Sequence, residues 1–276
     1  MDKFADYPAC VRVVLFLLLL GLLWLPFALP LYLWLGAEGA YSVVPLVVLY
    51  VIFVGWLRVW GQKVHRHPQP LCAHGLAISA RNRQELLIGV VTGLSSLGLL
   101  FLVEGWLGWL VWHPLPDGFW RILIEGFLVG LGVGLAEELL FRGWLLDELR
   151  YSWGFQSALW ASGLFYAALH FIKPWQAILT SLPSFPGLLL LGLTLGLARH
   201  RTQGRLGLAI GLHGGLVWGY YLIDVGDWAN YPKVVPDWVT GIYQNPLAGS
   251  MGVLFLLLMT AGIHYFPRHS VGKDVT

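Results

Sequence analysis

Charged residues are scarce in this chain. Only 12% of its 276 residues are Asp, Glu, Lys or Arg, and the formal net charge is +2. A soluble domain carries about 25% charged residues, so this chain has too few to cover a surface that faces water. The small net charge and the lack of a long basic run also argue against a nucleic-acid partner.

Cysteine is scarcer still. Cys10 and Cys72 are the only two, and their spacing matches no zinc-binding pattern. Both fall in segments that we place on the cytoplasmic side of a membrane, where thiols stay reduced. We therefore expect neither a structural disulfide nor a zinc site built from cysteine.

Apolar sequence is abundant. Hydrophobic residues make up 57% of the chain, and the mean hydropathy is +0.69. A membrane-spanning helix needs about 20 mostly apolar residues. Eight stretches meet this need: 11–35, 41–60, 86–112, 120–146, 156–173, 175–199, 206–223 and 249–266. We expect an all-α, polytopic membrane protein, a single domain over residues 1–276 with about eight transmembrane helices. Pro26 and Pro30 predict a kink or break in the first of them.

Loop charges orient this bundle. Basic residues such as Lys63, Arg150 and Arg201 follow the second, fourth and sixth stretches, whereas the alternate loops are richer in aspartate. The positive-inside rule then places both termini in the cytoplasm, in a cell membrane or an inner-type organelle membrane. Residues 224–248 form a long loop on the opposite side, a candidate lid. The segment "HRHPQPLCAH" (65–74) matches no ordinary zinc spacing and is predicted to be a solvated loop.

Seven polar residues interrupt the apolar stretches. A charge at the bilayer centre costs about 2.5–3.5 kcal/mol on insertion scales, so such residues are candidates for function. They are Glu104, Glu125, Glu137, Glu138, Arg142, His170 and His213. Glu104 and Glu125 have neighbours that favour a structural role, because tryptophans flank the first and Arg121 lies one turn from the second.

The stretch "GVGLAEELLFRGWLLDELR" (132–150) holds three of the seven. Glu138 and Arg142 are four residues apart with the acid first, the order that favours an ion pair on a helix. Gly126, Gly130 and Gly134 continue the same stripe and predict close packing with another helix. Glu137 lies about 100° around the helix and has no partner of its own, which makes it the strongest candidate for catalysis.

Three motifs in this half of the chain resemble a known family. "EELLFRG", "FYAALH" and "GLHGGLVWG" fall on separate predicted helices. Together they are similar to the motifs of the CAAX prenyl protease and bacteriocin-processing family, also called the Abi family, which is a family of intramembrane glutamic endopeptidases. The resemblance covers residues 120–223, the expected catalytic core. Two positions depart from the family pattern, since Tyr166 replaces a Phe and Val217 replaces an Asn.

The resemblance implies a hydrolytic site. Glu137 would act as the general base for a water, and His170 and His213 would bind that water or the developing oxyanion. Glu138, Arg142 and Tyr166 would support them. A buried carboxylate suits this chemistry, because desolvation moves its pKa toward neutrality. The expected partners are the lipid bilayer and a hydrophobic or membrane-associated peptide or protein.

Several alternatives stay open. No cofactor is expected, but Glu137, His170 and His213 would also make a reasonable two-histidine, one-glutamate zinc site. Val217 favours a second function, a catalytically silent membrane scaffold or immunity-type protein that keeps the family fold. A proton-coupled transporter would also use buried Glu and His residues, although no inverted repeat is visible in the sequence.

Overall fold

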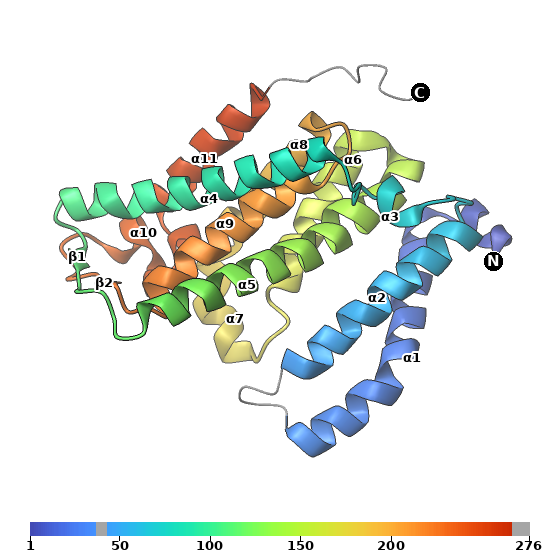
Figure 1. Ribbon diagram of the computed structural model, residues 1–276, viewed down its shortest axis with the longest axis horizontal. Coiled ribbons are helices and arrows are strands. Elements are labelled where there is room, and N and C mark those ends of the chain that lie inside the picture. Colours follow the sequence, from blue (N-terminus) through green and yellow to red (C-terminus); the bar gives the residue numbers. More distant parts are fainter. Residues whose placement is uncertain (37–42, 267–276) are drawn as a thin grey trace.

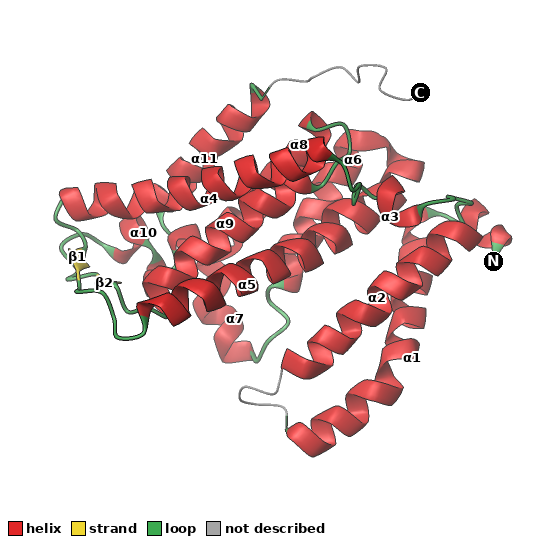
Figure 2. Ribbon diagram, in the orientation of Figure 1, coloured by secondary structure: helices red, strands yellow, loops and turns green. Residues whose placement is uncertain are grey.

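The structure, a computed structural model, describes residues 1–36 and 43–266. Helices dominate these residues, and the only strands among them are two short ones that pair antiparallel, with Val111 opposite Asn230 (Figures 1 and 2). The expected all-α class is confirmed. The elements in chain order are η1 (Asp2–Asp6), α1 (Ala9–Leu35), α2 (Val43–Lys63), α3 (Pro70–Ala73), α4 (Ala80–Trp106), β1 (Val111–Trp112), α5 (Phe119–Glu137), η3 (Glu138–Leu145), α6 (Leu146–Leu169), α7 (Trp175–Ser181), η4 (Leu182–Ser184), α8 (Phe185–Arg201), α9 (Gly207–Asp224), β2 (Ala229–Asn230), α10 (Asp237–Thr240), η5 (Ile242–Gln244), η6 (Pro246–Ala248) and α11 (Ser250–His264).

Five helical stretches in the described part of the chain are long and apolar enough to cross a membrane. They are Ala9–Leu35, Val43–Lys63, Ala80–Trp106, Phe119–Leu169 and Trp175–Arg201. The protein is therefore a polytopic helical membrane protein. The 51-residue stretch Phe119–Leu169 covers the fourth and fifth expected spans, and α9 and α11 stand where the last two were expected. The count of eight spans and the cytoplasmic position of the termini stay predictions.

Several helix boundaries differ from those expected. α1 runs through Pro26 and Pro30 without ending, so of the two expected outcomes the break is wrong and the kink stays a prediction. The third helix begins at Ala80 and ends at Trp106, several residues before the boundaries expected from hydropathy. The first two residues of the second expected span, 41 and 42, lie outside the described residues.

The fourth and fifth helices meet at a glycine. Helical backbone continues past the expected end at residue 146 as far as Gly154, which has φ of +71° and ψ of 175°. A glycine adopts this left-handed conformation without steric cost. The fifth helix then ends at Leu169 rather than 173, and this places His170 at its C-terminal cap.

Helix α9 lies between α4 and α5 and packs most extensively against these two (Figure 1). Glycines permit the close approach. A Cβ atom at Gly130 of α5 would lie 2.5 Å from the carbonyl oxygen of Gly214, and one at Gly89 of α4 would lie 2.5 Å from that of Leu208. The predicted packing surface of the glycine stripe is therefore confirmed. The close packing places His213 of α9 next to Glu137 and Glu138, at the C-terminal end of α5.

Helices α1 and α2 form a hairpin beside the main bundle (Figure 1). One attachment is aromatic: Phe16 of α1 stacks on Trp144 of η3 with ring centroids 3.9 Å apart. Many side chains of this hairpin stay exposed, including Leu22, Leu33 and Trp34. An apolar outer face of this kind suits contact with lipid.

Candidate active site

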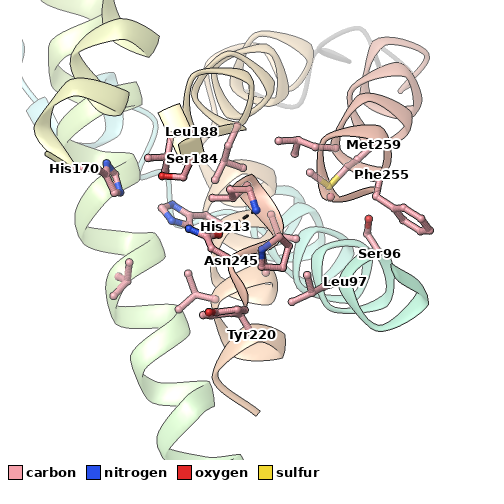
Figure 3. Close-up of a pocket in the computed structure, with 18 of the residues that line it drawn as sticks. Ser96, Leu97, His170, Ser184, Leu188, His213, Tyr220, Asn245, Phe255 and Met259 are labelled. Carbon is pink, nitrogen blue, oxygen red and sulfur yellow. Dashed lines mark hydrogen bonds between the residues drawn. The ribbon is translucent and has the colours of Figure 1, made fainter. Parts of the chain in front are cut away.

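A cavity of about 370 Å³ opens among α4, α5, α6, α8, α9 and α11 (Figure 3). Its size and mostly apolar lining are typical of a small-ligand or peptide side-chain site. Glu137, Tyr166, His170, His213 and Val217 all line it. The structure thus brings together the three candidate catalytic residues, which lie on three separate helices.

Glu138 sits at the centre of a buried ion-pair network. Its Oε1 accepts a hydrogen bond from Nη1 of Arg142 at 2.7 Å and one from Nδ1 of His213 at 2.9 Å. Arg142 also donates to the carbonyl oxygen of Gly192 on α8 and lies over the ring of Tyr166, 4.2 Å from its centroid. The predicted Glu138–Arg142 pair is present, and it also orients His213.

Glu137 is held differently from its neighbour. Its side chain is 30% exposed toward the cavity, and its Oε2 has no hydrogen-bond partner among the described residues. Nε2 of His213 lies 3.8 Å from Oε2. This separation is too long for a direct hydrogen bond and is compatible with a bridging water.

The tautomer of His213 follows from its partner. A carboxylate only accepts hydrogen bonds, so Nδ1 of His213 carries the hydrogen that it donates to Glu138. In the neutral ring, Nε2 is then a lone-pair acceptor, as is Oε2 of Glu137. Two facing acceptors suit a water molecule that donates one hydrogen to each and keeps its own lone pairs free.

His170 reaches the cavity from the C-terminal end of α6 (Figure 3). Its Nδ1 lies 2.7 Å from the carbonyl oxygen of Tyr166, and its ring packs edge-on against the Tyr166 ring with centroids 4.6 Å apart. A carbonyl oxygen also only accepts, so Nδ1 donates and Nε2 of the neutral ring is an acceptor. Tyr166 therefore contacts both Arg142 and His170, which agrees with the supporting position expected for it.

The helix changes its winding directly after Glu137. Residues Glu138–Leu145 form a π-helix, and such segments recur at functional sites. Side chains from other helices donate hydrogen bonds to carbonyl groups of this segment. Ser162 donates to the carbonyl oxygen of Phe141, and Arg199 donates to that of Arg142. These contacts explain why the unusual winding is stable here, since buried carbonyl groups need partners.

A second pair of adjacent carboxylates, Asp147 and Glu148, lies in the first turn of α6, directly after the π-helix. Glu148 accepts hydrogen bonds from Nε of Arg12, Nε1 of Trp60 and Nε2 of His65, at 2.6–2.9 Å. Asp147 accepts two from Arg199 and one from His74. This cluster could not be predicted from local sequence patterns, because Arg12 lies 136 residues from Glu148.

The histidine-rich segment 65–74 belongs to the same cluster. His65 and His74 are buried against the two carboxylates, so the expectation of a solvated loop is wrong for these two residues, whereas Pro68, Gln69 and Cys72 of the same segment are exposed. His67 lies between them, donating to or accepting from the hydroxyl of Tyr151 at 2.8 Å. Burial and the neighbouring His74 lower the pKa of His67. Three histidines converge here because each finds a polar partner.

The remaining candidates lie elsewhere. Glu104 is fully buried near the C-terminal end of α4, where its Oε2 accepts a hydrogen bond from the hydroxyl of Tyr231 at 2.6 Å and its Oε1 has no partner among the described residues. Glu125 is 45% exposed and pairs with Arg121. Neither lines the cavity. Both therefore lie outside the candidate site, and the structural role expected for them stays a prediction.

A metal site would need several His, Cys, Asp or Glu side chains that converge on one point. No group of three or more His, Cys, Asp or Glu side chains in the described ranges is placed to hold a metal ion. Glu137 and His213 approach each other, but the arrangement of the candidate zinc triad does not fit a metal as it stands. No step of the reaction proposed below uses zinc.

Sequence reasoning overlooked Asn245 and several hydroxyl residues of the cavity wall, among them Ser96, Ser184 and Tyr220. Asn245, in the loop before α11, lines the cavity together with Pro246 and Leu247 (Figure 3). This places part of the expected lid, residues 224–248, against the site. The loop has no helical periodicity, so its sequence held no signal for the direction of this side chain.

Comparison with known proteins gives one match. Residues 119–219 match the model of the Rce1-like family, described as type II CAAX prenyl endopeptidase Rce1-like. The matched region contains Glu137, His170 and His213, and the resemblance expected from the motifs is confirmed over these residues. No curated protein and no solved structure was found to match the chain.

Proposed function

We propose that this protein is an intramembrane endopeptidase that hydrolyses a peptide bond in a membrane-associated or hydrophobic substrate. The observation that carries the proposal is the unpartnered Oε2 of Glu137, 3.8 Å from Nε2 of His213 within a largely apolar cavity. The match of residues 119–219 to a family of CAAX prenyl endopeptidases supports the same reaction class. The bilayer would supply the substrate from the side.

The reaction begins with a water between Glu137 and His213. Glu137 takes a proton from this water as its oxygen attacks the carbonyl carbon of the scissile bond. The resulting tetrahedral intermediate carries the negative charge on the former carbonyl oxygen. Glu137 then returns the proton to the amide nitrogen, the C–N bond breaks, and a carboxylic acid and an amine leave. General acid–base catalysis of this kind contributes about 10²–10⁴-fold to the rate.

The other predicted residues position this water. Glu138 fixes the tautomer of His213, and Arg142 pairs with Glu138 in a buried position. His170 presents a second acceptor nitrogen to the cavity and would orient the water or the substrate amide. Tyr166 holds both Arg142 and His170 in place through its ring.

The experiment compares two Glu→Gln variants of the same helix. Full-length protein in proteoliposomes is mixed with a pool of internally quenched apolar peptides, and cleaved bonds are identified by mass spectrometry. Glu137→Gln keeps the shape of the side chain but cannot accept the proton, so turnover should fall about 10²–10⁴-fold. Glu125→Gln, on an exposed face outside the cavity, should keep wild-type turnover.

A wild-type rate for Glu137→Gln would refute the proposal. The alternative, a silent scaffold that keeps the family fold, has Val217 in its favour, since this apolar side chain lines the cavity where the family motif has an Asn. It predicts no cleavage by the wild-type protein, and a partner or phenotype that survives replacement of Glu137, His170 and His213.

A further inference from the structure

The histidine and arginine side chains of the proposed site offer no hydrogen-bond donor for the oxyanion, so a donor must come from another residue of the cavity wall. Nε2 of His213 and Nε2 of His170 are acceptors when the rings are neutral, because Nδ1 of each ring donates to Glu138 or to the carbonyl oxygen of Tyr166. Arg142 is turned toward Glu138, Gly192 and the Tyr166 ring. A tetrahedral intermediate needs N–H or O–H donors aimed at its negative oxygen.

Asn245 is the one carboxamide among the residues that line the cavity. Its Oδ1 accepts a hydrogen bond from the backbone N–H of Leu247 at 3.0 Å. Only the oxygen of a carboxamide can accept, so this contact fixes which way the group faces. Within the described chain the Nδ2 group of Asn245 donates to no residue, and it stays available for a ligand.

The backbone around Asn245 is held in an uncommon conformation. Gly241, Tyr243 and Gln244, just before it, have φ of +140°, +56° and +61°. Positive φ is costly for the two non-glycine residues, and strain of this kind persists only where the surroundings impose it, most often at functional sites. The loop is also packed tightly, since a Cβ atom on Gly249 would lie 2.6 Å from the backbone nitrogen of Gly241.

We propose that Asn245 is the oxyanion donor of this site, with Nδ2–H directed at the carbonyl oxygen of the scissile bond. The inference rests on the proposed function. A neutral N–H donor in a water-poor cavity is well suited to stabilising an oxyanion. The inference assigns this role to a loop residue. Val217, one helical turn beyond His213, lines the same cavity, so an amide introduced there would reach the site from a second direction.

The test uses a substitution that keeps the local structure. Asn245→Asp still accepts the hydrogen bond from Leu247 but has no N–H to donate. We expect its kcat to fall about 10²–10³-fold, the typical cost of losing one oxyanion donor, with KM and the unfolding midpoint unchanged. Gln244→Asn is the matched control, because this neighbouring carboxamide is exposed and does not line the cavity; its kcat should equal that of wild type.

Relocation of the amide separates the effect of the added charge from the loss of the donor. Asn245→Ser removes the carboxamide without adding charge, and Val217→Asn added to it should recover at least tenfold in kcat. An Asn245→Asp variant with wild-type kcat, or with a loss confined to KM, would overturn the inference. Glu137→Gln run beside it distinguishes the two claims: if that variant is inactive while Asn245→Asp is fully active, the proposed function stands and only the assignment of Asn245 fails.

Discussion

One continuous helical stretch contains two pairs of adjacent carboxylates, and the two pairs differ in how many of their oxygens accept hydrogen bonds. Every oxygen of Asp147 and Glu148 has a hydrogen-bond donor. In the other pair, Oε2 of Glu137 and Oε2 of Glu138 have none among the described residues. The two pairs are ten residues apart and have the same chemistry, so partners alone distinguish them.

The comparison shows that hydrogen-bond partners distinguish a structural carboxylate from a candidate catalytic one. The Asp147–Glu148 pair ties the α1–α2 hairpin and α8 to the bundle through Arg12, His65 and Arg199. Glu137 ties nothing together and faces a cavity. A buried polar atom without a partner needs an explanation, and a catalytic task is one. Substitutions that remove one charge at a time measure this difference.

The largest effect on stability is expected at Glu148. Glu148→Gln leaves Arg12 buried without a counterion, and breaking a buried pair in this way costs about 3–5 kcal/mol. Chemical unfolding in detergent measures the loss, with Glu125→Gln as the control, because an exposed pair contributes about 1 kcal/mol or less. A stability equal to that of the control would mean that the cluster does not anchor the hairpin.

A smaller and mixed effect is expected at Glu138, which has both kinds of role. Glu138→Gln removes the charge that Arg142 pairs with and weakens the hydrogen bond that orients His213, because an amide oxygen is a weaker acceptor than a carboxylate. We expect a loss of about 1.5–3 kcal/mol in the free energy of unfolding, the range for hydrogen bonds to charged groups, together with reduced turnover. Loss of turnover at full stability would assign Glu138 to chemistry alone.

The smallest effect on stability is expected at Glu137. Glu137→Gln removes no hydrogen bond of the described structure, so the free energy of unfolding should stay within about 0.5 kcal/mol of wild type, as for substitutions away from structural features. The same unfolding assay measures this. A loss comparable to that of Glu148→Gln would erase the contrast between the two pairs.

The candidate site could be predicted from sequence as far as local patterns reach. The Glu138–Arg142 pair follows from a spacing of four, and the glycine stripe predicts close packing of α5 against another helix. Long apolar runs predict the helices themselves. Each of these signals depends only on residues within a few turns of one another.

What could not be predicted depends on contacts across the chain. The partners of Asp147 and Glu148 lie 52 to 136 residues away, so no local pattern marks them. Asn245 reaches the cavity from an irregular loop in which Tyr243 and Gln244 have positive φ, so no periodic pattern predicts the direction of its side chain. The left-handed conformation of Gly154 likewise moves a helix boundary that hydropathy alone placed elsewhere.

The π-helical segment Glu138–Leu145 separates the two acid pairs along one continuous helical stretch. Each residue of an α-helix advances the side chains by about 100°, and each residue of the wider π-helix advances them by less. The winding of this segment therefore sets the angle around the helix between Glu137, which faces the cavity, and the structural pair Asp147 and Glu148.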